Sequence, residues 1–167
     1  MTQLITVSGG YLSWPGGRVR AAIGKGGLKI DKGEGDGATP VGTFALRSLW
    51  YRADRVGIPA TALERFSISQ SSGWSDDPAD PDYNRPVRLP HTARHERLWR
   101  EDGLYDVIVP LGYNDDPAVP GLGSAIFLHC AKPDYGPTEG CVAIARGDLL
   151  VLLAGCGPET RIEVRPD

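Results

Sequence analysis

Short runs of apolar and β-branched residues, each ended by glycine or proline, recur along the first fifty positions of the chain. Segments of this kind between turn residues are typical of strands in a meander. We therefore predict a series of short strands joined by tight turns. The predicted strands are 4–7, 11–14, 19–23 and 43–46.

The last third of the chain has longer apolar runs and one helical segment. Residues 146–154 form an apolar stretch that Gly155 and the Gly157-Pro158 pair would stop, which predicts a helix. The remaining runs are short enough for buried or edge strands. These predicted strands are 105–109, 125–129, 141–144 and 161–164.

The middle of the chain is the least regular. Residues 71–86 are dominated by Ser, Asp, Pro and Gly, so we predict a long loop, and Trp74 and Tyr83 within it favour an ordered one. Residues 91–100 contain several good helix formers and predict a short helix.

Composition agrees with a mostly-β domain that has one or two short helices. The 167 residues include 22 glycines and 14 prolines, a share well above the usual value of about 12% and unfavourable to a helix bundle. The length fits one domain, and no linker or repeat divides it, so we expect a single domain over 1–167.

Charge and apolar patterning exclude several classes of partner. A net charge of −3 disfavours nucleic-acid binding, and the absence of a long apolar run disfavours membrane insertion. Three cysteines are too few for a disulfide scaffold. The first ten residues lack the basic and apolar regions of an export signal, which favours the cytoplasm.

Cys141 and His129 are the residues that best combine into a reactive pair. His129 ends a predicted buried strand, and Cys141 follows Gly140 at the start of the next one. A thiol with a pKa near 8.5 is only about 3% ionised at pH 7, so a nearby imidazole that accepts its proton makes it a nucleophile. Gly140 lets the backbone approach a substrate and direct amide groups at an oxyanion. The pair predicts cysteine acyl transfer; an inert buried cysteine is the structural alternative.

Two blocks of sequence resemble the L,D-transpeptidase (YkuD-type) catalytic domain family. They are Gly35-Asp36-Gly37-Ala38-Thr39-Pro40-Val41-Gly42-Thr43-Phe44, and Ala125-Ile126-Phe127-Leu128-His129 followed by Thr138-Glu139-Gly140-Cys141-Val142. The resemblance spans nearly the whole chain and implies a curved, mixed-sheet sandwich. It further implies peptidoglycan stem peptides as donor and acceptor, no metal or organic cofactor, and action in the periplasm or cell envelope.

The reaction that the resemblance implies is a two-step acyl transfer. Cys141 attacks an L–D junction of a donor stem, and His129 passes the thiol proton to the leaving amine. The resulting thioester is then transferred to an amine of a second stem. Gly140 and Thr138 are expected at the oxyanion and substrate. A diaminopimelate–D-Ala donor bond would give 3–3 links and an L-Ala–D-Glu bond 1–3 links, and both stay open.

Three features depart from the family pattern. The interval between His129 and Cys141 is a few residues shorter, Glu139 stands where many members have a second histidine, and Ala143 replaces an Arg or Asn. Glu139 should raise the pKa of the thiol if it faces it. A substrate carboxylate then needs another partner, for which the candidates are Arg47, Arg85 and Arg146.

The other candidate site residues can each also be explained by a purely structural role. Tyr113 and Asn114 are expected to line the substrate pocket through a phenol and an amide, although a simple turn explains them equally well. His91 and His95 are spaced for one helix face but lack a third metal ligand. Cys130 should point away from His129 into the core, because successive residues of a strand face opposite sides.

Several functions compete with transpeptidation. Hydrolysis at the same site would make the protein an L,D-carboxypeptidase or endopeptidase, for which a cytoplasmic location is reasonable. A catalytically silent peptidoglycan-binding module would tolerate loss of Cys141. A zinc site formed by His129, Cys130 and Cys141 would bind stoichiometric metal. We expect a monomer in each case.

Overall fold

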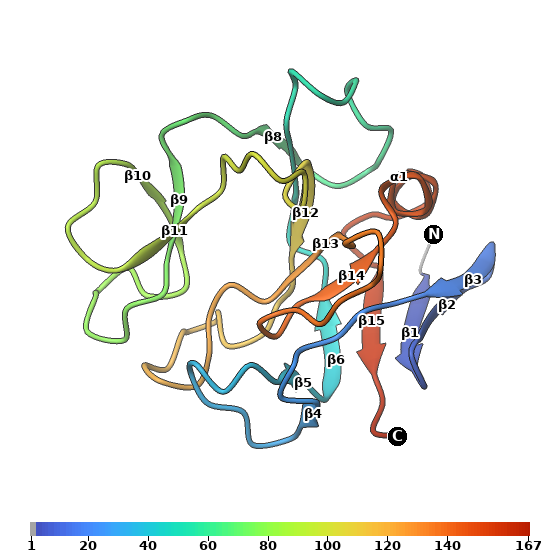
Figure 1. Ribbon diagram of the computed structural model, residues 1–167, viewed down its shortest axis with the longest axis horizontal. Coiled ribbons are helices and arrows are strands. Elements are labelled where there is room, and N and C mark those ends of the chain that lie inside the picture. The colour runs from blue at the N-terminus through green and yellow to red at the C-terminus, as the bar shows by residue number, and fades with distance from the viewer. Residues whose placement is uncertain (1–2) are drawn as a thin grey trace.

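The computed structural model describes residues 3–167, in which two five-stranded mixed sheets share one core (Figure 1). The first sheet has the order β3-β2-β1-β15-β6. The pair β1 and β15 is parallel and the other neighbours are antiparallel. The strands are β1 (Leu4–Ser8), β2 (Tyr11–Trp14), β3 (Gly17–Arg20), β6 (Gly42–Ala45) and β15 (Arg161–Val164).

The second sheet has the order β14-β13-β12-β7-β8 and positions the candidate site. The outer pairs β13–β14 and β7–β8 are parallel, whereas β12 is antiparallel to both of its neighbours. All residues of β12, β13 and β14 are buried, as expected for strands covered on both faces. The strands are β7 (Leu49–Tyr51), β8 (Arg65–Ser67), β12 (Val107–Pro110), β13 (Phe127–Cys130) and β14 (Val142–Ile144).

One helix, α1 (Arg146–Ala154), follows β14 directly and confirms the helix predicted at 146–154. Its buried side chains Leu149, Leu152 and Leu153 complete the core between the two sheets. No helix within residues 3–167 is long and apolar enough to span a membrane.

A three-stranded ribbon, β10-β9-β11, stands apart from the two large sheets (Figure 1). It comprises β9 (Ser72–Ser75), β10 (Pro86–Arg88) and β11 (His95–Arg97). Trp74 of β9 packs edge-on against Phe127 of β13, with ring centroids 5.1 Å apart, in a second hydrophobic cluster that includes Cys141. The ribbon is therefore anchored behind the candidate nucleophile. A short pair, β4 (Leu28–Lys29) and β5 (Thr39–Pro40), completes the fold.

The structure corrects the sequence predictions in two places. The helix predicted over 91–100 is wrong, because β11 pairs with β9 and Glu96 lies opposite Trp74. The segment 71–86 is ordered, as predicted, but its first part is β9 rather than loop. The mostly-β mixed-sheet fold is confirmed, with one helix in the described residues.

Candidate active site

The register of β13 and β14 brings His129 and Cys141 to one face of the second sheet. His129 pairs with Ala143, and Leu128 pairs with Val142, in the parallel ladder. Because side chains alternate along a strand, His129, Ala143 and Cys141 share a face, and Leu128 and Val142 point into the core on the other. Cys130 also faces the core, where its thiol donates to the Val107 carbonyl, as predicted.

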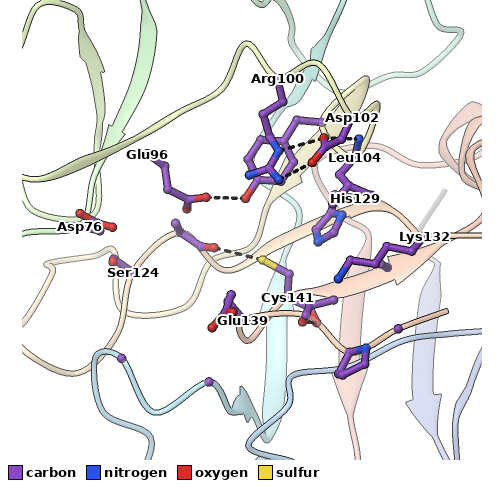
Figure 2. Close-up of a pocket in the computed structure, with 18 of the residues that line it drawn as sticks. Asp76, Glu96, Arg100, Asp102, Leu104, Ser124, His129, Lys132, Glu139 and Cys141 are labelled. Atoms are coloured by element: carbon purple, nitrogen blue, oxygen red, sulfur yellow. Dashed lines mark hydrogen bonds and ion pairs between the residues drawn. The ribbon is translucent and has the colours of Figure 1, made fainter. Parts of the chain in front are cut away.

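That face forms the floor of a cavity of about 630 Å³, a volume ordinary for a small-molecule or peptide site. Figure 2 shows the side chains of His129, in β13, and Cys141, the residue before β14, among those that line this cavity. Each of the two residues is 6% exposed, so substrate must come to a nearly buried pair. The small side chain of Ala143, which also lines the cavity, leaves room above the floor.

Hydrogen bonds fix the state of both side chains. The Cys141 thiol donates to the Ala125 carbonyl at 3.3 Å and accepts from the Phe127 amide at 3.3 Å. His129 Nδ1 lies 2.9 Å from the Cys130 carbonyl oxygen, which can only accept, so Nδ1 carries the hydrogen. The neutral imidazole therefore keeps its lone pair on Nε2, the nitrogen that can take a proton.

Burial keeps both groups uncharged at neutral pH. Burial, together with the Glu96 carboxylate and against the opposing effect of the Phe127 amide, raises the pKa of the Cys141 thiol to about 12. Burial also lowers the pKa of His129 to about 4, against the opposing effect of the Cys130 carbonyl. The resting pair is thus a thiol and a neutral imidazole, so proton transfer must accompany attack.

Thr138 and Gly140 support Cys141 from the backbone side. The Thr138 hydroxyl donates to the Cys141 carbonyl at 2.7 Å and accepts from the Gly140 amide at 3.1 Å. Thr39 also donates to the Cys141 carbonyl, at 3.4 Å, and so ties the first sequence block to the second. The Gly140 amide is already engaged, which leaves its expected oxyanion role without support.

The structure does not bring Tyr113 and Asn114 to this cavity. The Tyr113 hydroxyl donates to the Leu122 carbonyl at 2.6 Å. The Asn114 amide nitrogen donates to the carbonyls of Val119 and Gly123. Both polar groups therefore stabilise their own loop, and neither residue lines the cavity.

The arginines suggested for a substrate carboxylate also lie elsewhere. Arg47 pairs with Asp115 and, with Arg85, lines a second, smaller cavity, while Arg146 pairs with Asp106. Lys132, two residues after β13, lines the main cavity instead and forms no ion pair within residues 3–167. Its position beside a strand end was the only signal that sequence offered.

The structure gives no support to a metal site at His91 and His95 or at the cysteines. His91 Nε2 lies 2.6 Å from the Asp80 carboxylate, and the His91 and His95 rings are 5.9 Å apart. Among residues 3–167, no group of three or more His, Cys, Asp or Glu side chains has an arrangement suited to a metal ion. Glu139 points to Lys25, 2.9 Å away at the surface.

Comparison with known proteins gives one strong match. The sequence model of the L,D-transpeptidase catalytic domain, YkuD, matches residues 2–164. A solved structure, L,D-transpeptidase 1 of Mycobacterium tuberculosis, is 12% identical and has a TM-score of 0.44. That similarity covers 99% of this chain and 58% of the mycobacterial chain. No curated protein matches.

Proposed function

Because this chain belongs to the YkuD family of L,D-transpeptidase catalytic domains, we propose that it transfers acyl groups between peptidoglycan stem peptides at the cell wall. Cys141 is the nucleophile and His129 its general base in this proposal. One catalytic domain spans 1–167 and acts as a monomer. The family match supports a peptidoglycan cross-linking enzyme, and the particular residues and reaction are our inference.

One observation carries the proposal: His129 and Cys141 line the same cavity, and the hydrogen bond from His129 Nδ1 leaves Nε2 free to accept a proton. At rest the Cys141 thiol donates to the Ala125 carbonyl, so the thiol hydrogen must turn toward His129 for the reaction. In the first step the sulfur bonds to the donor carbonyl carbon while its proton passes to Nε2 of His129. His129 then protonates the leaving amine as the carbon–nitrogen bond breaks. The product is a thioester on Cys141.

In the second step an acceptor amine attacks the thioester. The new carbon–nitrogen bond forms, the carbon–sulfur bond breaks, and the amine proton returns through His129 to the sulfur. Lys132 supplies the positive charge for a substrate carboxylate, the task for which Ala143 is unsuited. Water in place of the amine would give hydrolysis, so exclusion of water from the cavity decides the outcome.

Product analysis tests this proposal. The purified protein is incubated with stem-peptide donors that carry either candidate L–D bond, and the products are separated and weighed. We expect cross-linked dimers from one donor. Trimmed monomers alone would support the hydrolase, and equal behaviour of wild type and Cys141→Ala would support a binding module. Cys156→Ala, at a buried cysteine beyond α1, is the matched control and should retain activity.

A further inference from the structure

Most charges around the cavity are already neutralised by partners. The cavity-lining basic groups Lys32, Arg94 and Arg100 are each ion-paired to an aspartate, Asp36, Asp76 and Asp102 respectively. These pairs leave little free charge for a substrate. Two carboxylates of the cavity, those of Glu34 and Glu96, have no Lys or Arg nitrogen within 4.0 Å among residues 3–167. The Glu34 carboxylate accepts hydrogen bonds from the hydroxyls of Tyr83 and Ser124, whereas the Glu96 carboxylate accepts from Tyr105.

Glu96 is held in a defined place by Tyr105. The Tyr105 hydroxyl donates to Glu96 Oε1 at 2.7 Å, and the Tyr105 ring packs edge-on against His129, with ring centroids 5.4 Å apart. Backbone pairing of Glu96 with Trp74 fixes the strand beneath it. Figure 2 shows Glu96 directed toward the middle of the cavity, with Cys141 between it and Lys132.

A partly buried carboxylate without a cation is suited to bind one. Burial raises the pKa of Glu96, so its charge is costly while the cavity is empty, and an entering cation favours the ionised form. The acceptor in the proposed reaction is an aliphatic amine, which reaches the protein as an ammonium group at neutral pH. This ammonium group must bind near the thioester on Cys141 before it loses a proton and attacks.

We propose that Glu96, positioned by Tyr105, binds the ammonium group of the acceptor and thereby selects cationic amines for the second step. The cavity then offers two charged positions to the substrates: Glu96 binds the acceptor ammonium group, and Lys132 binds a carboxylate. This inference rests on the proposed function, because it assigns a role in the transfer that follows thioester formation.

The test separates the two half-reactions and uses Glu96→Gln, which keeps the shape and still accepts from Tyr105. The acyl-enzyme is formed with a donor stem, and its decay is then followed with two acceptors. One acceptor is a stem peptide with a free side-chain amine, and the other is hydroxylamine, a nucleophile that is uncharged at neutral pH. We expect transfer to the cationic amine to fall about 10- to 100-fold at subsaturating acceptor, the loss of one charge-assisted hydrogen bond.

The reaction with hydroxylamine should stay within about 2-fold of wild type, because this acceptor carries no charge for Glu96 to bind. Donor acylation should not slow, because the Glu96 carboxylate raises the pKa of the Cys141 thiol and its removal favours proton loss from the sulfur. Glu64→Gln removes an exposed carboxylate that does not line the cavity and should change nothing. Tyr105→Phe removes the hydroxyl that positions Glu96. It should also slow transfer to the cationic amine more than the reaction with hydroxylamine, but by less than Glu96→Gln does. It also keeps the proposal testable if Glu96→Gln fails to fold.

Equal losses with both acceptors, or no loss with either, would overturn the assignment of Glu96. Failure of the wild type to form any acyl-enzyme would instead refute the proposed function. The two failures are therefore distinguishable in one experiment.

Discussion

Replacing Gly140 with alanine should destabilise the protein and disturb the residue that follows it. Gly140 has φ +134°, a backbone conformation that L side chains rarely adopt. An alanine Cβ there would lie 2.8 Å from the Ala38 carbonyl oxygen and 3.4 Å from Ile126 Cδ1. Because the nearest atom belongs to the backbone, side-chain movement cannot relieve the contact.

The magnitude follows from two contributions. Strain at the unfavourable φ costs about 1–3 kcal/mol, and the backbone clash adds about 1–2 kcal/mol of displacement, as in other overpacked sites. Together they predict a loss of about 3 kcal/mol, which corresponds to a fall in melting temperature of about 6–12 °C for a domain of this size. Acylation of Cys141 should slow by about 100-fold if the backbone shift misplaces the sulfur by about 1 Å.

Thermal unfolding of Gly140→Ala and Gly121→Ala, followed by circular dichroism, separates the two contributions. Gly121 also has a positive φ, +88°, but an added Cβ would meet nothing within 4 Å. Gly121→Ala should therefore show the strain alone, about 1 kcal/mol. Equal losses in the two variants, or wild-type stability of Gly140→Ala, would refute the role of close packing behind the nucleophile.

Three further predictions concern electrostatics and buried polar contacts. Burial raises the pKa of Asp36, but hydrogen bonds, led by the one from Lys32, outweigh burial and lower the pKa to about 2. This shift corresponds to about 2 kcal/mol of folding stability without solvent screening, and to about 1 kcal/mol with it. Asp36→Asn should lose that stability at neutral pH. The difference between its free energy of unfolding in urea and that of the wild type should shrink as pH falls from about 4 toward 2, because the wild-type carboxylate is then protonated. Asn84→Ala should cost about 3 kcal/mol of stability and slow acylation. The Asn84 side-chain oxygen accepts from the backbone N–H of Ala125 and from Trp74 Nε1, and its nitrogen donates to the carbonyls of Tyr113 and Asn114. An unchanged free energy of unfolding in urea would contradict this. The acylation rate with an uncharged donor should be constant from about pH 5 to pH 8, since the pKa of His129 is about 4; a midpoint near 6.5 would contradict it.

Local patterns in the sequence predicted much of the fold. The helix at 146–154 follows from an apolar run with glycine after it, and it matches α1. The strands were found within a few residues, but 125–129 begins later than expected because Ala125 has φ +53° and is not extended. The error at 91–100 has a different cause: pairing with β9, distant in sequence, overrides local helix propensity.

The candidate site was only partly predictable. Cys141 and His129 could be singled out because each has a local signature, a preceding glycine and a strand end. Glu96 and Lys132 could not, because their significance depends on which charges lack partners across the cavity, and no local pattern encodes that. Tyr113 and Asn114 were suggested by residue type alone, and the hydrogen bonds of their side chains lie within their own loop.

Mass spectrometry after incubation with a carbapenem tests the reactivity of Cys141 most directly. The family resemblance suggests that such a β-lactam acylates the nucleophile. We expect the intact protein to gain the mass of one opened carbapenem, peptide mapping to locate it on Cys141, and Cys156→Ala to react as the wild type does. A folded protein that gains no adduct, or an adduct on Cys130 or Cys156 only, would contradict Cys141 as the acyl-accepting residue.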